Sequence, residues 1–349
     1  MRKLCAVTAA IALLGLSIAC NADVFGLTNM ETVTVGDPGN NSELSGAGAG
    51  GYGPDRICGS VSYTYNIGKY EVTAAQYCDF LNHKAKSDPY GLYNTDMWSS
   101  DRGCKIQRTS DSDSYSYSVT SYWANRPVNY VSYWDACRFA NWLHNGQGDG
   151  DTETGAYTLN GYNGSDGRDI LRNTDWKWAV TNEDEWYKAA YYKGGGTNAG
   201  YWDYPMQSDI PTIPSNDISD PDGGNNANFY QNDFTLDSPY WRTEIGEFEN
   251  SESAYGTFDQ GGNVCEWNES ICAFIEGCVY RGSRGSSFSS YDYALWASER
   301  EHINQISEYS HLGFRVSNVY TSPQVPEPAS VILGAGGLIS LFGLRRRKA

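Results

Sequence analysis

The sequence predicts a single α+β domain with short helices and many loops. Three helices are indicated by capping signals, and short β runs alternate with turns of glycine, asparagine, aspartate and serine. The 349 residues include 38 glycines, 27 tyrosines and 11 tryptophans, a composition that favours loops around an aromatic core. No proline- or serine-rich linker divides the chain between Asp23 and Tyr320, so we expect one domain over residues 23–320.

Each predicted helix is preceded by a residue whose side-chain hydroxyl can accept a hydrogen bond from the backbone amide three residues later. The side chain at that later position can in turn accept a hydrogen bond from the backbone amide of the first residue. The pairs and the helices they open are Thr73 and Gln76 before 74–86, Ser132 and Asp135 before 133–145, and Thr181 and Asp184 before 182–192. The second helix has an apolar stripe that includes Cys137, so we expect a buried thiol there, and the same for Cys78 on the first helix. The clearest β runs are residues 62–67 and 278–281.

The N-terminal end has the pattern of a secretory signal. Arg2 and Lys3 precede an apolar run over residues 4–19, and small residues follow up to Ala22. We therefore predict a signal peptide over residues 1–22, with cleavage after Ala22. A lipoprotein box at residues 17–20 ranks second, because it lacks the usual leucine three residues before its cysteine.

The C-terminal segment, residues 321–349, combines a short motif, an apolar run and a basic tail. Pro326, Glu327 and Pro328 precede an uncharged stretch over 329–344, which is followed by four basic residues at 345–348. As a helix the stretch would span about 24 Å, shorter than a bilayer core of about 30 Å. The segment resembles the PEP-CTERM sorting signal of Gram-negative bacteria, and an ordinary single-pass anchor is the alternative. The resemblance implies export across the inner membrane, transient anchoring by the C-terminal transmembrane helix, cleavage by an exosortase, and delivery to the cell surface or extracellular matrix.

The charge balance narrows the range of partners. The chain has 25 basic and 42 acidic residues, a net charge of −17. Without Arg2, Lys3 and the four basic tail residues, 19 basic residues face the 42 acidic ones, so the exported body is near −23. Nucleic acid is therefore not an expected partner, since phosphate binding needs clustered lysine and arginine. An acidic body of this kind either recruits divalent cations or is simply well solvated.

Seven cysteines follow the signal, an odd number for an oxidising compartment. They are Cys58, Cys78, Cys104, Cys137, Cys265, Cys272 and Cys278. Cys272 and Cys278 flank residues 273–277, a predicted hairpin tip, and form the candidate local disulfide. The glycine-rich segment 46–53 lacks the strand, lysine and helix of a phosphate-binding loop, so we expect a flexible entry to the domain.

Several blocks, taken in order along the chain, resemble the formylglycine-generating enzyme (sulfatase-modifying factor) family. They are YEVTAAQY at 70–77, RPVNYVSYWDA at 126–136, TNEDEW at 181–186, GGNVCEW at 261–267, RGSSF at 284–288 and GFR at 313–315. The resemblance implies the family's loop-rich variant of the C-type lectin-like fold. We expect Trp186 and Trp267 to be core aromatics and Arg315 to be a buried ion-pair partner.

The same resemblance implies calcium as the cofactor. The first family site maps onto the Asp259 side chain, the Gly262 and Val264 carbonyls, and the Glu266 side chain, a set of oxygen ligands that suits calcium. The second site, where loop lengths differ from the family's, maps onto Asn228, the Phe229 carbonyl, Asp237 and the Pro239 carbonyl. A further acidic run at 149–153 has asparagine at its twelfth position, where a calcium loop needs an acid, and is expected to be a solvated turn.

The family's oxidase uses two copper-binding cysteines, and the sequence departs from that pattern. The first position falls on Ser290 and the second near Leu295, within a segment, 289–298, that contains no cysteine. A hydroxyl does not replace a thiolate as a ligand for Cu(I), so copper is not expected. We therefore expect a binding or structural module without catalytic residues, with exosortase as its processing partner and extracellular polysaccharide or other surface proteins as candidate ligands. Two alternatives stay open: an oxidase acting on protein cysteine that uses Cys265 with Cys272 or Cys278, and a carbohydrate-binding module.

Overall fold

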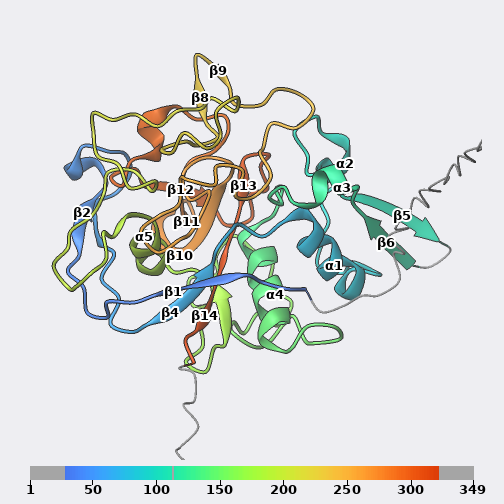
Figure 1. The fold of residues 1–349 in the computed structure, drawn as a ribbon. Helices are drawn as coiled ribbons and strands as arrows, with labels where there is room; N and C mark the ends of the chain where they lie inside the picture. The colour runs from blue at the N-terminus through green and yellow to red at the C-terminus, as the bar shows by residue number, and fades with distance from the viewer. Residues whose placement is uncertain (1–27, 112–113, 322–349) are drawn as a thin grey trace, which may run out of the picture. The chain divides into compact units, whose positions relative to one another are not determined.

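Two four-stranded sheets organise the domain in the computed structural model, which describes residues 28–111 and 114–321 (Figure 1). The first sheet is antiparallel, in the order β1 (Thr32–Val35), β4 (Tyr65–Gly68), β14 (Val316–Val319), β7 (Trp178–Val180). The second has the order β12 (Glu301–Asn304), β11 (Cys278–Arg284), β10 (Cys265–Ile275), β13 (Leu312–Gly313), and only its β10–β13 pair is parallel. Strands from the two ends of the domain therefore meet in the first sheet, and the described chain up to Val319 forms one unit.

Three two-stranded ribbons lie outside these sheets. They are β2 (Glu43–Ser45) with β3 (Arg56–Cys58), β5 (Gln107–Asp111) with β6 (Ser114–Ser118), and β8 (Tyr230–Gln231) with β9 (Asp233–Phe234). The last ribbon turns at Asn232, whose φ of 65° asparagine tolerates better than most residues. Long loops carry much of the remaining chain, as the composition predicted.

The three predicted helices form, each with a complete capping box. They are α1 (Ala74–Lys84), α4 (Tyr133–His144) and α5 (Glu183–Tyr191). The first two use the predicted caps, Thr73 and Ser132. The third prediction was wrong by one residue, because Asn182 and Glu185 make the box and Thr181 precedes it. Shorter helical turns are α2 (Asp96–Ser99), α3 (Ser121–Ala124), η1 (Ala47–Ala49) and η2 (Asp292–Leu295).

The main core is aromatic and lies between α1, α4 and the chain next to β14. Phe139 of α4 packs against Phe80 of α1 and against Phe314, with ring centroids 5.4 Å apart in both pairs. Both contacts are edge-on, the favourable arrangement for aromatic pairs. Cys78 and Cys137 lie in this core, so the prediction of buried thiols is confirmed.

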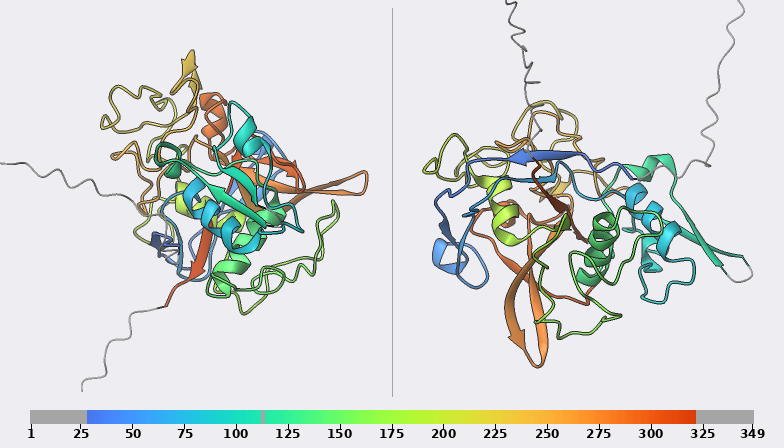
Figure 2. Two further views of the ribbon diagram at one scale, coloured as in Figure 1. Left: turned by 90° about the vertical axis from the view of Figure 1, so that its right-hand side faces the viewer. Right: turned by 90° about the horizontal axis from the view of Figure 1, so that it is seen from below.

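The β10–β11 hairpin projects from the domain body (Figure 2). Its tip is at Glu276 and Gly277, as predicted, but the predicted Cys272–Cys278 disulfide was wrong, since both thiols are free. The cause is the register: Cys278 pairs with Ile275, and Cys272 falls at an irregularity between Ile271 and Ala273. In the part of the chain that the structure describes, all seven cysteines are free.

The glycine-rich segment 46–53 is a packed part of the domain rather than a flexible entry. The Gly46 amide donates to the Ser298 carbonyl at 2.9 Å, and the Arg300 amide donates to the Tyr52 carbonyl at 3.1 Å. A Cβ at Gly53 would lie 1.9 Å from the Arg300 carbonyl oxygen, so this close approach requires glycine. The flexible-entry expectation was therefore wrong.

The predicted signal peptide (1–22), the sorting motif at Pro326, Glu327 and Pro328, and the apolar and basic segments after it lie outside the described residues. Within residues 28–111 and 114–321, no helix combines the length and apolar character that a membrane crossing needs.

Candidate functional site

The loop that carries the first predicted calcium site has an unusual backbone. Asp259, Gly262 and Asn263 all have positive φ angles, of 60°, 91° and 60°. A Cβ at Gly262 would lie 2.2 Å from the Asn228 carbonyl oxygen, so only glycine fits at this approach. The Asn263 amide donates to the same carbonyl at 2.8 Å, which holds the loops of the two predicted sites together.

Three carboxylates surround this loop, those of Glu71 and Glu266 buried and that of Asp259 partly exposed, and one guanidinium faces them. Glu71 and Glu266 are at most 1% exposed. Burial raises the pKa of Glu71 well above its usual range, and the Asp259 and Glu266 carboxylates raise it further. Burial also raises the pKa of Asp259 to about 6. Burial is the main cause of both pKa shifts; in formal charge, three carboxylates face the single guanidinium of Arg315.

Glu266 is held from two sides. Arg315 donates to its carboxylate in a bidentate pair, with Nε–Oε2 and Nη2–Oε1 distances of 2.6 and 2.7 Å. The indole Nε1 of Trp186 donates to Oε2 at 2.8 Å. Trp186, Trp267 and Arg315 are fully buried, so their predicted core and ion-pair roles are confirmed.

The remaining predicted ligands have oxygen atoms that can accept further hydrogen bonds or bind an ion. The Gly246 amide donates to Asp259 Oδ2 at 2.7 Å, and Oδ1 has no hydrogen-bond partner among the described residues. Within that same part of the chain, the Gly262 and Val264 carbonyls accept no hydrogen bond. A carboxylate has about four acceptor sites, so Glu266 can also take a further ligand. The donor set, with its excess of negative charge, therefore fits calcium, although no three of the described His, Cys, Asp and Glu side chains alone could hold an ion.

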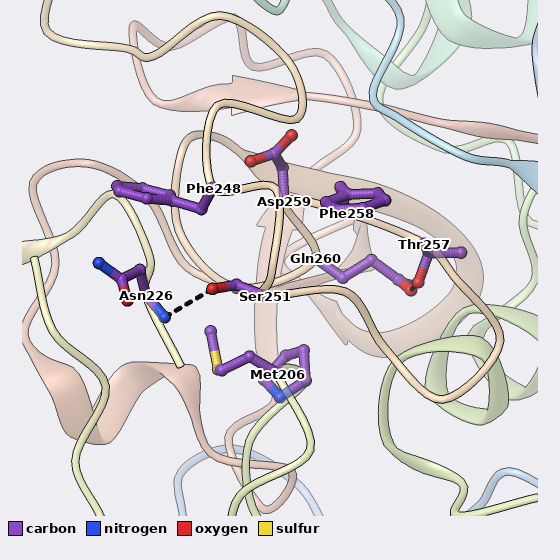
Figure 3. Close-up of a pocket in the computed structure, with 10 residues that line it drawn as sticks. Met206, Asn226, Phe248, Ser251, Thr257, Phe258, Asp259 and Gln260 are labelled. Carbon is purple, nitrogen blue, oxygen red and sulfur yellow. Dashed lines mark hydrogen bonds between the residues drawn. The ribbon is translucent and has the colours of Figure 1, made fainter. Parts of the chain in front are cut away.

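A small cavity of about 10 Å³ lies beside this loop, lined by Asp259 with Asn226, Ser251 and Met206 among others. The Asn226 amide donates to the Ser251 hydroxyl at 2.8 Å, and the Asp259 carboxylate points away from Met206 (Figure 3). A cavity of this size holds at most one water molecule. It belongs to the packing under the loop, because it includes neither Gly262 nor Glu266.

The second predicted calcium site is only partly assembled. Asn228 is buried, and its Oδ1 has no hydrogen-bond partner within the described chain. Its Nδ2 donates to the Asn263 side chain at 3.0 Å. The Phe229 carbonyl accepts from the Thr235 hydroxyl at 3.2 Å, while Asp237 and Pro239 lie exposed on a turn. Asn228 Nδ2 also donates to the Trp241 carbonyl at 3.1 Å, and the Trp241 amide donates to the Asp237 carbonyl at 3.3 Å, so Asn228 links the first loop to the turn that carries Asp237.

The acidic run at 149–153 is a turn, as expected. Asp151 accepts the Glu153 and Thr154 amides at 3.0 Å each, and Glu153 pairs with Arg138. The carboxylates of Asp151 and Glu153 are therefore already occupied by protein hydrogen-bond and ion-pair partners.

Hydroxyl groups occupy the place where the resemblance puts the copper cysteine. The Ser287 Oγ lies 3.2 Å from the Oγ atoms of both Ser289 and Ser290. Cys265 is 1% exposed, and its Sγ lies 3.7 Å from Glu301 Oε2. Burial, followed by the Glu301 charge, raises the pKa of the Cys265 thiol well above its usual range.

Two residues of the first site were missed by the sequence analysis. Glu71 lies far away in the chain, yet it accepts the Val264 amide at 3.3 Å and the Asn263 amide group at 3.2 Å. Asn263 links this carboxylate to Asn228 and Thr243. The sequence signal for Glu71 was its place in the YEVT block, and the signal for Asn263 was its place in the GGN block.

Comparisons with known proteins agree with this architecture. The crystal structure of CarF is similar at a TM-score of 0.51 and 20% identity, covering 84% of this chain and 99% of CarF. Treponema denticola variable protein 1 is similar at a TM-score of 0.49 and 17% identity, covering 85% of this chain and 98% of that protein. PvdO from Pseudomonas aeruginosa is similar at a TM-score of 0.48 and 17% identity, covering 83% of this chain and 95% of PvdO. At this identity the likeness to CarF shows a shared fold alone. No curated protein matches the chain in sequence.

Two family models match the sequence itself. The PEP-CTERM protein-sorting motif matches residues 324–348, which supports an exported protein that is sorted by an exosortase. The sulfatase-modifying factor enzyme 1-like domain matches residues 59–319, most of the chain. The protein therefore belongs to the sulfatase-modifying factor (formylglycine-generating enzyme-like) family and carries a PEP-CTERM sorting motif.

Proposed function

We propose that this protein is a binding or structural module of the cell surface or extracellular matrix, stabilised by calcium and without oxidase activity. The observation that carries the proposal is Ser290, which stands with Ser287 and Ser289 where the family's oxidase would place a copper-binding thiolate. Soft thiolates select Cu(I), and hydroxyls do not.

The geometry also argues against relocated thiols. Cys265 opens strand β10, and Cys272 lies seven residues further along the same strand, a separation of about 20 Å. Cys278 lies further still, because it pairs with Ile275 near the hairpin tip. One metal ion cannot join Cys265 to either of them. The buried Cys265 thiol is also a weak nucleophile, since reactivity needs an accessible thiolate.

Calcium would be held by the carboxylates of Asp259 and Glu266 with the carbonyls of Gly262 and Val264. When bound, the ion would add positive charge to a group of three carboxylates that has one arginine as its counter-charge. Its role would be to stabilise the loop, and Glu71 would keep the loop in place through the Val264 amide. The second set, around Asn228 and Asp237, is not included, because the Phe229 carbonyl already accepts a hydrogen bond and Asp237 is exposed.

The test is an oxidase assay on the full-length chain purified in detergent. We expect no conversion of a sulfatase-type cysteine peptide to formylglycine with or without added copper, measured by mass spectrometry. Elemental analysis should find calcium and no copper, in the wild type and in Cys265→Ser alike. An active family member that retains the cysteine pair is the positive control. Conversion by the wild type that disappears in Cys265→Ser would overturn the proposal.

A further inference from the structure

Four cationic side chains gather in one region without a carboxylate at ion-pair distance, although Glu244 and Glu247 lie near enough to Arg126 to act on its charge. Arg102, Lys105, Arg126 and Arg242 form no ion pair within 4.0 Å in the described chain. The sequence has 42 acidic against 25 basic residues, so acidic partners are abundant elsewhere. A group of unpaired cations in such a protein indicates a region of positive potential.

Two of the four are buried beneath this region. Arg242 is fully buried, and its Nη1 donates to the Arg102 carbonyl at 2.7 Å. Its Nε and Nη2 have no hydrogen-bond partner among the described residues. Arg126 donates from Nε to the Tyr122 carbonyl at 3.1 Å and from Nη1 to the Arg242 carbonyl. Carbonyl groups therefore fix both guanidinium groups in place without cancelling their charge.

Arg102 brings the positive charge to the surface. It is partly exposed, and its guanidinium carbon lies 4.8 Å from the ring centroid of Trp241, with Phe288 and Phe234 at 5.7 and 5.9 Å. None of its side-chain donors makes a hydrogen bond within the described residues, so its five N–H groups stay available. The nearby Asp101 carboxylate accepts instead from Trp241 Nε1 at 3.2 Å and from the Ser238 hydroxyl at 3.1 Å, which orients the indole.

A continuous run of aromatic rings leads away from Arg102. Successive ring centroids are 4.9 Å apart from Trp241 to Phe234, 4.9 Å from Phe234 to Tyr230, 5.3 Å from Tyr230 to Tyr291, and 5.9 Å from Tyr291 to Tyr293. The last two rings are about half exposed, at 51% and 50%, and lie within 13° of parallel. They belong to the segment around η2, which lies near the β8–β9 ribbon in Figure 1.

We propose that this Arg102–Tyr293 surface binds an acidic polysaccharide, with a sugar carboxylate on Arg102 and sugar rings on the tyrosines. Arginine holds a carboxylate through paired N–H donors, and the exposed tyrosine faces offer flat apolar surfaces with polar edges, which suit a sugar ring. A neutral glycan would not use the unpaired cations, and an extended acidic peptide would not need the two parallel rings. The run also passes Ser290, whose carbonyl accepts the Tyr230 amide at 2.8 Å, so the ligand would lie over the former oxidase position. The inference rests on the proposed function, since it names the ligand class of that binding module.

Binding to oligogalacturonate tests the inference, with the full-length chain in detergent and calorimetric titration as the readout. The matched probe is its methyl ester, which keeps the sugar rings and removes the charge. We expect binding to oligogalacturonate that weakens with added salt, and loss of affinity by about tenfold or more for the methyl ester, for Arg102→Ala and for Tyr291→Ala. Arg168→Ala, which removes an equally charged surface arginine paired with Asp166, should bind like the wild type.

Three outcomes would overturn the inference. They are equal binding of the ester, equal binding of poly-glutamate, and no binding by wild-type protein whose circular dichroism shows it folded. Trp241→Phe keeps the ring beneath Arg102 and should retain most of the affinity, which separates a lost contact from a lost fold. The formylglycine assay is independent, so oxidase activity would refute the proposed function while this titration still reports on the ligand.

Discussion

Two buried charge clusters on neighbouring strands have opposite balances. Glu266 on β10 and Arg284 on β11 lie opposite each other in the register, yet each pairs elsewhere. Arg284 turns to Glu183, which also accepts from Arg300 at 2.6 and 2.8 Å. Arg56 adds a third guanidinium, 3.4 Å from Glu183. Glu266 instead shares one guanidinium, Arg315, with two further carboxylates.

The two clusters shift the pKa values of their carboxyl groups in opposite directions. The Glu183 pKa lies well below its usual range, because Arg284 and Arg300 outweigh the cost of burial. The pKa values of Glu71 and Asp259 are raised, because burial and neighbouring carboxylates outweigh Arg315. The first cluster has an excess of positive charge, with three guanidinium groups against the carboxylates of Glu183 and Asp184. The second lacks positive charge, and this lack is the physical basis for proposing calcium there.

Removing the central carboxylate of the first cluster should have the largest effect. Glu183→Gln leaves three guanidinium groups around a neutral side chain, two of them almost fully buried. We expect the free energy of unfolding to fall by about 3–5 kcal/mol in urea titrations. Glu31→Gln, which removes a surface pair with Lys69, is the control and should change little. Equal effects of the two substitutions would contradict the comparison.

Calcium should distinguish the second cluster from the first. At about 100 times its dissociation constant, calcium should stabilise the wild type by about 2.7 kcal/mol, seen as a rise in Tm that chelation reverses. Asp259→Asn should abolish this response, since it removes a ligand charge.

The control for that experiment is Asp149→Asn in the acidic turn at 149–153, which should respond to calcium like the wild type. No shift for the wild type, or an equal shift for Asp259→Asn, would show that the first loop holds no ion.

The smallest effect is expected for a third carboxyl group, that of Glu308, whose protonation makes the free energy of unfolding depend on pH. Burial and the Asp135 charge raise the pKa of Glu308 to about 8 from an ordinary 4.5. The folded state therefore binds a proton more tightly than the unfolded state, so this contribution is fully present below pH 4.5 and is lost as pH rises to 8. The full pKa shift corresponds to about 5 kcal/mol, and because the Glu308 side chain is partly exposed to solvent, we expect Glu308→Gln to flatten the fall in stability between pH 5 and 8 by about 1–2 kcal/mol. An unchanged pH profile would exclude Glu308 as its source.

The parts of the fold that depend on local sequence could be predicted well. The capping boxes of α1 and α4 involve residues three apart, so the sequence contains the whole interaction. At α5 two neighbouring residues both qualified as caps, and the structure uses Asn182 because Glu185 completes its box. Thr181 is buried, with no partner for its hydroxyl in the described chain.

Contacts between distant segments could not be predicted in the same way. The Cys272 error arose because irregular pairing near Ile271 changes which residues face each other. Glu71 joins the first site from about 190 residues away, through bonds to Asn263 and Val264. The resemblance supplied the ligand loop, but the acids behind it became visible only once the chain was folded.

Strand β14 ends at Val319, seven residues before Pro326 of the sorting motif, and it is an inner strand of its sheet. Every hydrogen-bonded strand of the described chain thus precedes the motif. An exosortase that cuts there would leave these described strands uncut. Cleavage at the motif would therefore remove no residue of the two four-stranded sheets.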